Sequence, residues 1–362
     1  MRAYIIDTNM ISKYFGSIFS WLMKPVFDLL AVLTWNKSFK NNLFLGNYWL
    51  NFLGLHVVRV SVAHLMWRFR LLILSPLVTS HLRRQFIRDG VIVLKDVLEP
   101  KAYRALREAV LKYSGRKQQF FEGATRVERI YMPQSDLFST SKFGLLGNSR
   151  LFKDLMRWTS SKNRYPISYV ENLTNHCGDG SAPDPQRDVH SDSFHPCVKG
   201  WFYLDGADEN NGPFCYVRGS NRLTWKRVKW EWRQSLLASR RSTTATEGRY
   251  WDGSFRVTPE DLDAMGLRLE PIDVPENSLV IANVFGFHCR GEALAPSNRL
   301  TLWFQMRDNP FNPIPALMPS FASQITERIW LKMMNLRDAK RVRSGELELR
   351  EGRVSRLGEA CE

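Results

Sequence analysis

The chain has 362 residues, of which 44% are hydrophobic and 24% charged, so a disordered chain is excluded. Lysine and arginine number 51 against 36 aspartate and glutamate residues, which gives a formal net charge of +15. Such a charge attracts phosphate-rich or acidic partners (nucleic acid, anionic lipid or an acidic substrate), although it can also serve solubility alone.

Residues 1–80 form a basic, apolar leader that we expect to be helical. The stretch 15–35 is apolar, but Lys24 and Asp28 interrupt it, so a clean spanning helix is not expected. The stretch 56–74 mixes large apolar side chains with arginines, which is typical of a helix lying in a membrane interface. The alternative is that these helices pack against the domain that follows.

The region 81–325 is expected to be the functional domain, with mainly β structure. The stretch 86–94 predicts the end of a helix, a turn at Asp89-Gly90 and a β-branched strand, and a helix is expected over about 99–112. Beyond about residue 165, short apolar runs between Gly, Pro and Asn turns are typical of a sandwich or barrel. The strongest strands are expected at 198–204, 278–284 and 299–306.

An insertion at about 223–269 separates two of these strands. It begins with a run rich in Trp, Lys and Arg, and Thr258 with Pro259 marks the start of a later helix. It is too long for a hairpin loop, so we interpret it as a lid or substrate-facing segment, or else as a structural flap. The last stretch, 326–362, is charged and predicts a helix followed by a loose tail.

His190 and Asp192 stand two residues apart, so on an extended segment their side chains leave the same face. A neighbouring imidazole and carboxylate can supply two adjacent ligands to one divalent metal ion. We expect the third ligand to be His288, at the end of a predicted strand. Two histidines and one carboxylate form the facial triad of non-haem iron(II) oxygenases. An H-x-D pair alone is weak evidence, because it is as often a structural feature.

Arg299 stands at the start of an expected strand, a short loop after His288. This spacing would bring Arg299 into the same cavity from the neighbouring strand. A guanidinium can hold a carboxylate through two parallel hydrogen bonds. A dicarboxylic keto acid needs such a group, with its keto-acid end on the metal and its far carboxylate on the arginine.

Three segments together resemble the phytanoyl-CoA dioxygenase family: His190-Ser191-Asp192, KGWFYLDGADENNGPFCYVRGSNRLT over 199–224, and HCRGEALAPSNR over 288–299. The resemblance covers about 85–308 and implies a double-stranded β-helix (jelly-roll) core with flanking helices. It also implies iron(II), 2-oxoglutarate and dioxygen as cofactor and co-substrates, with iron on His190, Asp192 and His288 and 2-oxoglutarate on Arg299. Trp201 falls where the family places an aromatic residue beside the co-substrate.

Three features depart from the family pattern or stay open. Arg218-Gly219-Ser220-Asn221 stands where the family usually has Pro-Gly-Ser-His, which concerns the stability of a turn. A further partner of 2-oxoglutarate is expected before His190, and Arg126, Arg129 and Tyr131 are the candidates. His195 either lines the substrate pocket or hydrogen-bonds a loop.

The motifs do not identify the substrate, but the basic leader and insertion favour an anionic substrate presented at a membrane. The leader and the HSDSFHP motif are similar to those of bacterial hydroxylases of the Kdo sugar of lipopolysaccharide. That similarity implies a cytoplasmic protein held peripherally on the inner membrane. One alternative is a soluble hydroxylase of an acyl-CoA or small metabolite, and another is a non-catalytic metal-binding sensor. Because no nucleic-acid module is recognisable, a nucleic-acid partner is not expected.

The five cysteines include no C-x-x-C pair and are odd in number. In a chain of this size they favour reduced thiols in a cytoplasmic compartment. No short apolar run is followed by a small-residue cleavage site, so a secretory signal is not expected.

Overall fold

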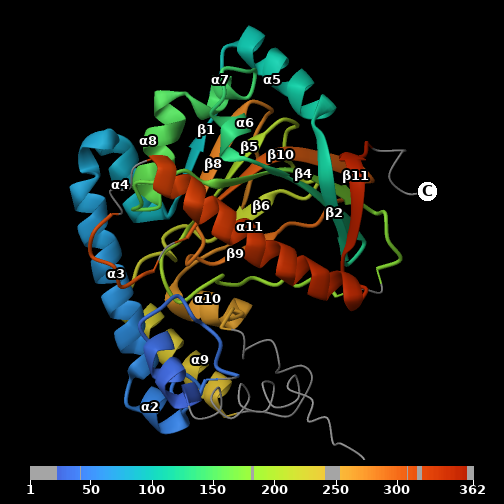
Figure 1. The fold of residues 1–362 in the computed structure, drawn as a ribbon. Coiled ribbons are helices and arrows are strands. Elements are labelled where there is room, and N and C mark those ends of the chain that lie inside the picture. Colours follow the sequence, from blue (N-terminus) through green and yellow to red (C-terminus); the bar gives the residue numbers. More distant parts are fainter. Residues whose placement is uncertain are drawn as a thin grey trace, which may run out of the picture.

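The computed structural model describes residues 23–40, 42–180, 183–240, 253–307, 309–315 and 320–356 (Figure 1). The predicted leader is therefore described from residue 23 onward and the insertion without its residues 241–252. The predicted C-terminal tail is described as far as residue 356. Predictions that fall on the other residues lie outside the described part of the chain.

Two antiparallel sheets form the core of the molecule. The larger sheet contains, in spatial order, β1 (Val91–Leu94), β8 (Ser278–Asn283), β5 (Val198–Tyr203), β10 (Ser297–Met306), β4 (Ile167–Asn175), β3 (Thr125–Met132), β2 (Ser114–Glu122) and β11 (Glu348–Arg353). The smaller sheet contains β7 (Glu270–Ile272), β6 (Phe214–Tyr216) and β9 (His288–Arg290). Side chains of both sheets share one apolar cluster, with Trp201 and Val280 against Phe214 and Ile272. Two facing antiparallel sheets confirm the predicted jelly roll.

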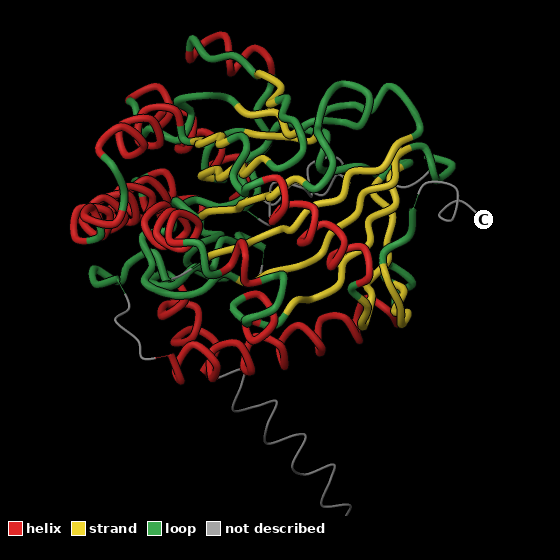
Figure 2. Tube along the Cα trace, turned by 90° about the horizontal axis from the view of Figure 1, so that it is seen from above, coloured by secondary structure: helices red, strands yellow, loops and turns green. Residues whose placement is uncertain are grey.

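The two faces of the larger sheet pack against different parts of the molecule, because successive side chains on a strand point to opposite faces. On one face Phe202, Leu302 and Phe304 pack under the helices in the largest apolar cluster. Figure 2 shows these helices gathered on one side of the strands. They are α3 (Leu55–Ile73), η1 (Ser75–Leu77), α4 (Ser80–Asp89), α5 (Pro100–Lys112), α6 (Gln134–Leu137), α7 (Gly144–Gly147) and α8 (Arg150–Thr159). The other face is turned toward the smaller sheet.

The elements at the start of the domain lie where the sequence predicts them. Helix α4 ends at Asp89, and Gly90 then takes a left-handed φ of 79° before β1 begins. Only glycine adopts this conformation without strain, and a side chain here would also meet Tyr216 and Asn221. Helix α5 begins with Pro100 in its first turn, where the missing N–H costs no hydrogen bond.

Two sequence predictions about the C-terminal half are wrong in detail. His288 does not end the strand that begins at Ser278, because β8 stops at Asn283 and a turn leads into β9 of the smaller sheet. The predicted loose tail is also partly ordered: after helix α11 (Ser320–Arg343), residues 348–353 form β11 and pair with β2. This edge strand extends the larger sheet by one strand beyond the predicted domain.

Helix α9 (Trp225–Ser239) of the insertion packs against the leader, while residues 255–257 pair with the backbone of 189–191. Helix α9 contacts both α2 (Tyr48–Phe52) and α3, and α10 (Pro259–Met265) follows with Thr258 as its cap. A buried network of polar side chains joins α9 to α3. Arg227 donates to Glu231 at 3.0 Å, and Glu231 lies 2.9 Å from His56 of α3. The inner face of α3 therefore packs against the domain, which was the alternative to a membrane-interfacial helix.

No helix among the described residues combines the length and apolarity needed to cross a membrane. Cys197, Cys215 and Cys289 are buried free thiols. Cys177 is disulfide-bonded, so the prediction that all five thiols are reduced is wrong at that position.

Burial of His64 predicts a loss of stability in mild acid. Its Nδ1 lies 2.8 Å from the Val60 carbonyl oxygen, and its ring meets Phe285 edge-on. Burial lowers the pKa of His64 to about 4, although the hydrogen bond to Val60 acts in the opposite direction. Between pH 6.5 and 4 the unfolded chain therefore binds a proton at this residue that the folded chain does not, so stability falls as the pH falls.

We expect this residue to account for about 2 kcal/mol of unfolding free energy lost between pH 7 and pH 5. Urea unfolding of wild type and His64→Leu at both pH values measures it, since the variant should lose less stability than wild type. Equal losses in the two proteins would contradict the prediction.

Candidate metal centre

The backbone brings the three predicted metal ligands together. His190 and His288 exchange two hydrogen bonds, from His190 N to His288 O at 2.9 Å and from His288 N to His190 O at 3.0 Å. Asp192 N donates to the Val284 carbonyl at 3.0 Å, so the H-x-D segment is fixed along the turn that precedes β9. This pairing, rather than the sequence spacing alone, places His288 beside the other two residues.

Candidate ligand atoms of His190, Asp192 and His288 all lie within 4.8 Å of one another. Asp192 Oδ1 is 3.5 Å from His190 Nε2 and 3.8 Å from His288 Nε2. Each imidazole directs its Nδ1 to a backbone carbonyl, of Asp188 at 2.7 Å and of Gly286 at 2.9 Å. These contacts assign the proton to Nδ1 and leave a lone pair on each Nε2 for a metal ion.

The environment keeps His288 and Asp192 in the forms that bind metal. His288 Nε2 is buried and has no hydrogen-bond partner among the described residues. Burial, helped by the nearby His190, lowers the pKa of His288 to about 3, so its ring is neutral. Burial alone would raise the pKa of Asp192, but Lys199 and the two histidines outweigh it and hold this pKa well below its usual range. Two imidazoles and one carboxylate fit an iron(II) ion.

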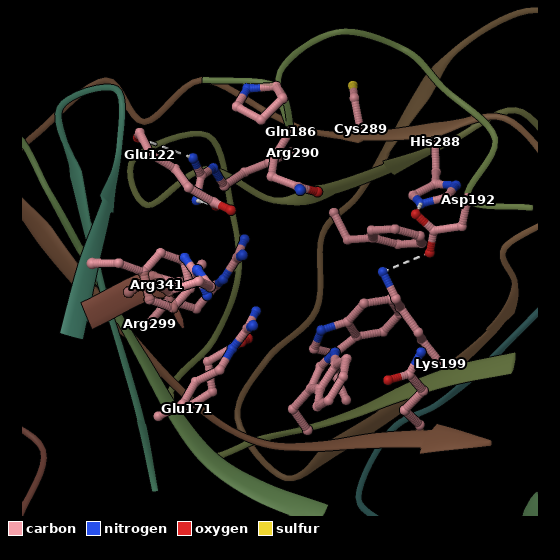
Figure 3. Close-up of a pocket in the computed structure, with 18 of the residues that line it drawn as sticks. Glu122, Glu171, Gln186, Asp192, Lys199, His288, Cys289, Arg290, Arg299 and Arg341 are labelled. Carbon is pink, nitrogen blue, oxygen red and sulfur yellow. Dashed lines mark hydrogen bonds and ion pairs between the residues drawn. The ribbon is translucent and has the colours of Figure 1, made fainter. Parts of the chain in front are cut away.

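Lys199 is a site residue that the sequence analysis missed. Its Nζ lies 2.6 Å from Asp192 Oδ2, and Figure 3 shows it reaching toward that carboxylate. Lys199 stands two residues before Trp201 on β5, so both side chains leave the same face of the strand. The spacing of two residues from Trp201, which was predicted to lie beside the co-substrate, could have identified Lys199 as a cavity residue from the sequence.

Asp192 and His288, which form a cluster with His190 as its third member, line one side of a cavity of about 980 Å³ between the two sheets and α11. Its lining is strongly basic, with nine Lys or Arg against four Asp or Glu side chains. The basic residues are Lys37, Arg129, Lys199, Arg290, Arg299, Arg307, Arg337, Lys340 and Arg341, and the acidic residues are Glu122, Glu171, Asp192 and Glu346. Such a cavity favours an anionic ligand.

Arg299 lines this cavity, across it from Asp192 and His288 (Figure 3). The route by which it enters differs from the prediction. Its strand β10 pairs with β5 and β4 in the larger sheet, so Arg299 reaches in from the sheet that faces His288 and not from a neighbouring strand. The guanidinium is buried and donates to the Gly212 carbonyl, which fixes its position.

The remaining predicted residues fall into two groups. Trp201 and Arg129 line the cavity, with Trp201 packed on Phe214 and Arg129 paired with Glu171. Three do not line it. Arg126 leaves the opposite face of β3 from Arg129. Tyr131 bonds to Glu327 of α11, and His195 is buried with its Nδ1 3.0 Å from the Pro196 carbonyl.

The C-terminal helix supplies cavity residues that the sequence analysis assigned to a plain charged helix. Arg337, Lys340 and Arg341 of α11 line the cavity. By contrast, no described residue of the insertion at 223–269 does so. The part of the insertion that the structure describes therefore gives no support to the lid interpretation, and α11 lies where a lid was expected.

Comparison with known proteins agrees with this geometry. The family model described as phytanoyl-CoA dioxygenase (PhyH) matches residues 86–249. No curated protein matches the chain. Solved structures to which the chain is distantly similar include the epimerase SnoN from nogalamycin biosynthesis, in complex with Fe³⁺, α-ketoglutarate and nogalamycin RO. SnoN is 16% identical, with a TM-score of 0.40, and the match covers 65% of this chain and 84% of that one.

Two further structures are similarly distant. HygX from Streptomyces hygroscopicus, with nickel and 2-oxoglutarate bound, is 17% identical with a TM-score of 0.36, over 63% of this chain and 86% of that one. EctD from S. alaskensis, with bound Fe, is 14% identical with a TM-score of 0.37, over 63% and 76% of the two chains. Likenesses this distant assign no substrate to the chain.

Proposed function

Because the chain belongs to the phytanoyl-CoA dioxygenase family through residues 86–249, we propose that it hydroxylates an aliphatic C–H bond of an anionic substrate. The match confirms the family predicted from the sequence motifs. It also confirms the enzyme class and the iron, 2-oxoglutarate and dioxygen that the family uses. The observation that carries the proposal is the convergence of His190, Asp192 and His288 at one side of a basic cavity.

The chain's own residues divide the work of the reaction. Iron(II), when bound with 2-oxoglutarate, supplies the oxidising chemistry that activates dioxygen toward a C–H bond. His190, Asp192 and His288 hold the ion from one side and leave its other positions open. Arg299, across the cavity, binds the far carboxylate of 2-oxoglutarate, and Lys199 keeps Asp192 ionised and in place.

The excess of basic side chains in the cavity supports an anionic substrate. Arg337, Lys340 and Arg341 belong to α11 and not to β10, the strand of Arg299, so they are available to a second anion beside 2-oxoglutarate. The candidate that fits the predicted leader and metal motif is the acidic Kdo sugar of a lipopolysaccharide precursor. An acyl-CoA, whose phosphates would meet the same arginines, is the alternative substrate.

The first test is an anaerobic titration of the purified protein with iron(II) and 2-oxoglutarate, followed by visible absorption. Wild type is expected to develop the weak charge-transfer band of the iron chelate, and His190→Ala is not. His176→Ala is the matched control, because His176 is an exposed histidine bonded only to the Ala293 carbonyl among the described residues. A folded wild-type protein without the band would favour the non-catalytic sensor instead.

The substrate is tested separately by mass spectrometry of glycolipid from cells that produce the enzyme. The Kdo proposal predicts a gain of one oxygen atom on the inner-core sugar, absent in cells that produce the His190→Ala variant. Unmodified glycolipid beside an enzyme that develops the charge-transfer band would reject this substrate and leave the acyl-CoA alternative.

A further inference from the structure

The outer face of helix α3 is apolar, unlike the outer face of a helix on a water-exposed surface. Its outer face carries a continuous apolar stripe at the helical spacing of three and four residues: Val58, Val62, Leu65, Phe69 and Leu72, all exposed. Single exposed apolar side chains are normal, but a stripe along a whole helix is not. Such a face calls for an apolar partner.

The buried face of the same helix carries polar groups with partners, beside the apolar Val60, Ala63, Trp67 and Leu71. Arg59 donates to the carbonyls of Val32 at 2.8 Å and Asn36 at 2.7 Å, and Arg70 donates to Ser161 Oγ at 3.0 Å. His56 pairs with Glu231. These bonds fix which side of α3 faces outward, so the apolar stripe is exposed in the folded protein.

The apolar surface continues onto the elements that contact α3. Helix α2 exposes Trp49 and Phe52, and Phe52 packs on Trp232 of α9. The segment 26–35 adds further exposed apolar side chains, and Arg59 ties this segment to α3. We call the exposed apolar side chains of α3, α2 and 26–35 the apolar face. It belongs to one packed layer of helices, seen at the left and bottom of Figure 1.

The exposed charges named around the apolar face are positive, while Asp28 of the 26–35 segment is buried and paired with Lys24. From residue 29 to residue 88 the chain contains no aspartate or glutamate. Lys40 and Arg68 are exposed within this stretch, and Lys226 and Lys229 are exposed on the neighbouring α9. A second copy of the same face would bring these positive charges together, whereas anionic lipid headgroups would neutralise them.

The apolar face also borders the catalytic cavity. A groove of about 540 Å³ is lined by Phe27, Leu30 and Trp35, and it shares Lys37 and Arg307 with the cavity that holds the metal ligands. An amphiphile could therefore rest its apolar part in the groove while its anionic group enters the cavity. This continuity links the surface to the route of the substrate.

From these observations we propose that the apolar face docks the enzyme on an anionic lipid bilayer, with the groove directed to the membrane as the substrate's entrance. Docking itself does not depend on the proposed reaction, whereas the entrance role rests on it. The helices lie in the interface without crossing it, with apolar side chains in the acyl region and Lys and Arg at the headgroups.

The test is co-sedimentation of the full-length protein with phosphatidylcholine vesicles, with and without phosphatidylglycerol. Wild type should sediment with the anionic vesicles, and added salt should weaken this binding. Leu65→Glu/Phe69→Glu should raise the lipid concentration for half-maximal binding at least about tenfold, because two apolar contacts are lost. Leu294→Glu is the matched control, since Leu294 and Leu65 are both 63% exposed and Leu294 lies in a loop outside the helical layer.

Two readouts separate docking from the reaction and from dimerisation. Turnover of 2-oxoglutarate without vesicles should be the same in wild type and Leu65→Glu/Phe69→Glu, so a loss of binding reports on the surface alone. Equal sedimentation of that variant and wild type, or no sedimentation of wild type, would overturn the proposal. A wild-type dimer in light scattering that the variant abolishes, without vesicle binding, would assign the apolar face to a second copy instead.

Discussion

Asp192→Ala is expected to abolish 2-oxoglutarate turnover while leaving the fold intact. The carboxylate is the one acidic ligand in the cluster, and without it two neutral imidazoles bind a divalent ion weakly. Substitutions of residues that merely support metal ligands cost about 10–100-fold, so loss of the ligand itself should exceed 100-fold. The measurements are succinate formation under air and iron content after desalting, and both should fall together.

Asp188→Ala is the control for this prediction. Asp188 lies four residues earlier in the same segment, but it serves His190 through its backbone carbonyl, which alanine retains. Its side chain is 46% exposed, and Arg256 Nε lies 3.7 Å from its Oδ2. Activity within about threefold of wild type is expected, in line with other surface substitutions. If Asp192→Ala kept its iron and its turnover, the assignment of the metal centre would be wrong.

The metal centre could be predicted because part of its geometry is local. His190 and Asp192 share a face in any extended segment, so two of the three ligands follow from the spacing alone. The third required a tertiary pairing, the two hydrogen bonds between His190 and His288. The sequence analysis named His288 correctly as a member of the cluster but drew the strand too long. The chain leaves the larger sheet after Asn283, whose side chain accepts from Phe285 N at 3.2 Å and starts the turn.

The basic residues of α11 could not have been assigned to the cavity in the same way. Arg337 and Arg341 lie one helical turn apart, a pattern that is also typical of a solvated helix face. Their place at the cavity depends on contacts made over long sequence separations, such as Gln118 with Asp338 and Tyr131 with Glu327. The Trp-rich insertion misled the sequence analysis, because its composition suggested a surface for ligand binding. In the structure its helix α9 packs on the leader instead.

The sequence could not decide either whether α3 packs on the domain or lies at an interface. A sequence with apolar and basic residues mixed along one helix fits both an interfacial helix and a packed one. The structure contains both, because Arg59 and Arg70 turn inward to carbonyl and hydroxyl partners while Leu65 and Phe69 remain outside. Hydropathy averaged over the helix cannot distinguish these arrangements, since it discards which residues have partners.

Arg299→Gln is expected to raise the KM for 2-oxoglutarate by roughly 10–100-fold, the cost of a charged hydrogen-bonding pair, with a smaller effect on kcat. Arg299→Lys should recover only part of the loss, because an ammonium keeps the charge but not the two parallel hydrogen bonds. Initial rates over a range of 2-oxoglutarate concentrations measure both. Arg341→Gln is the matched control: Arg341 lies beside Arg299 in the cavity but comes from α11, so it should leave this KM nearly unchanged. A large KM effect in Arg341→Gln and a small one in Arg299→Gln would contradict the prediction. The far carboxylate of 2-oxoglutarate would then be assigned to Arg341 of α11.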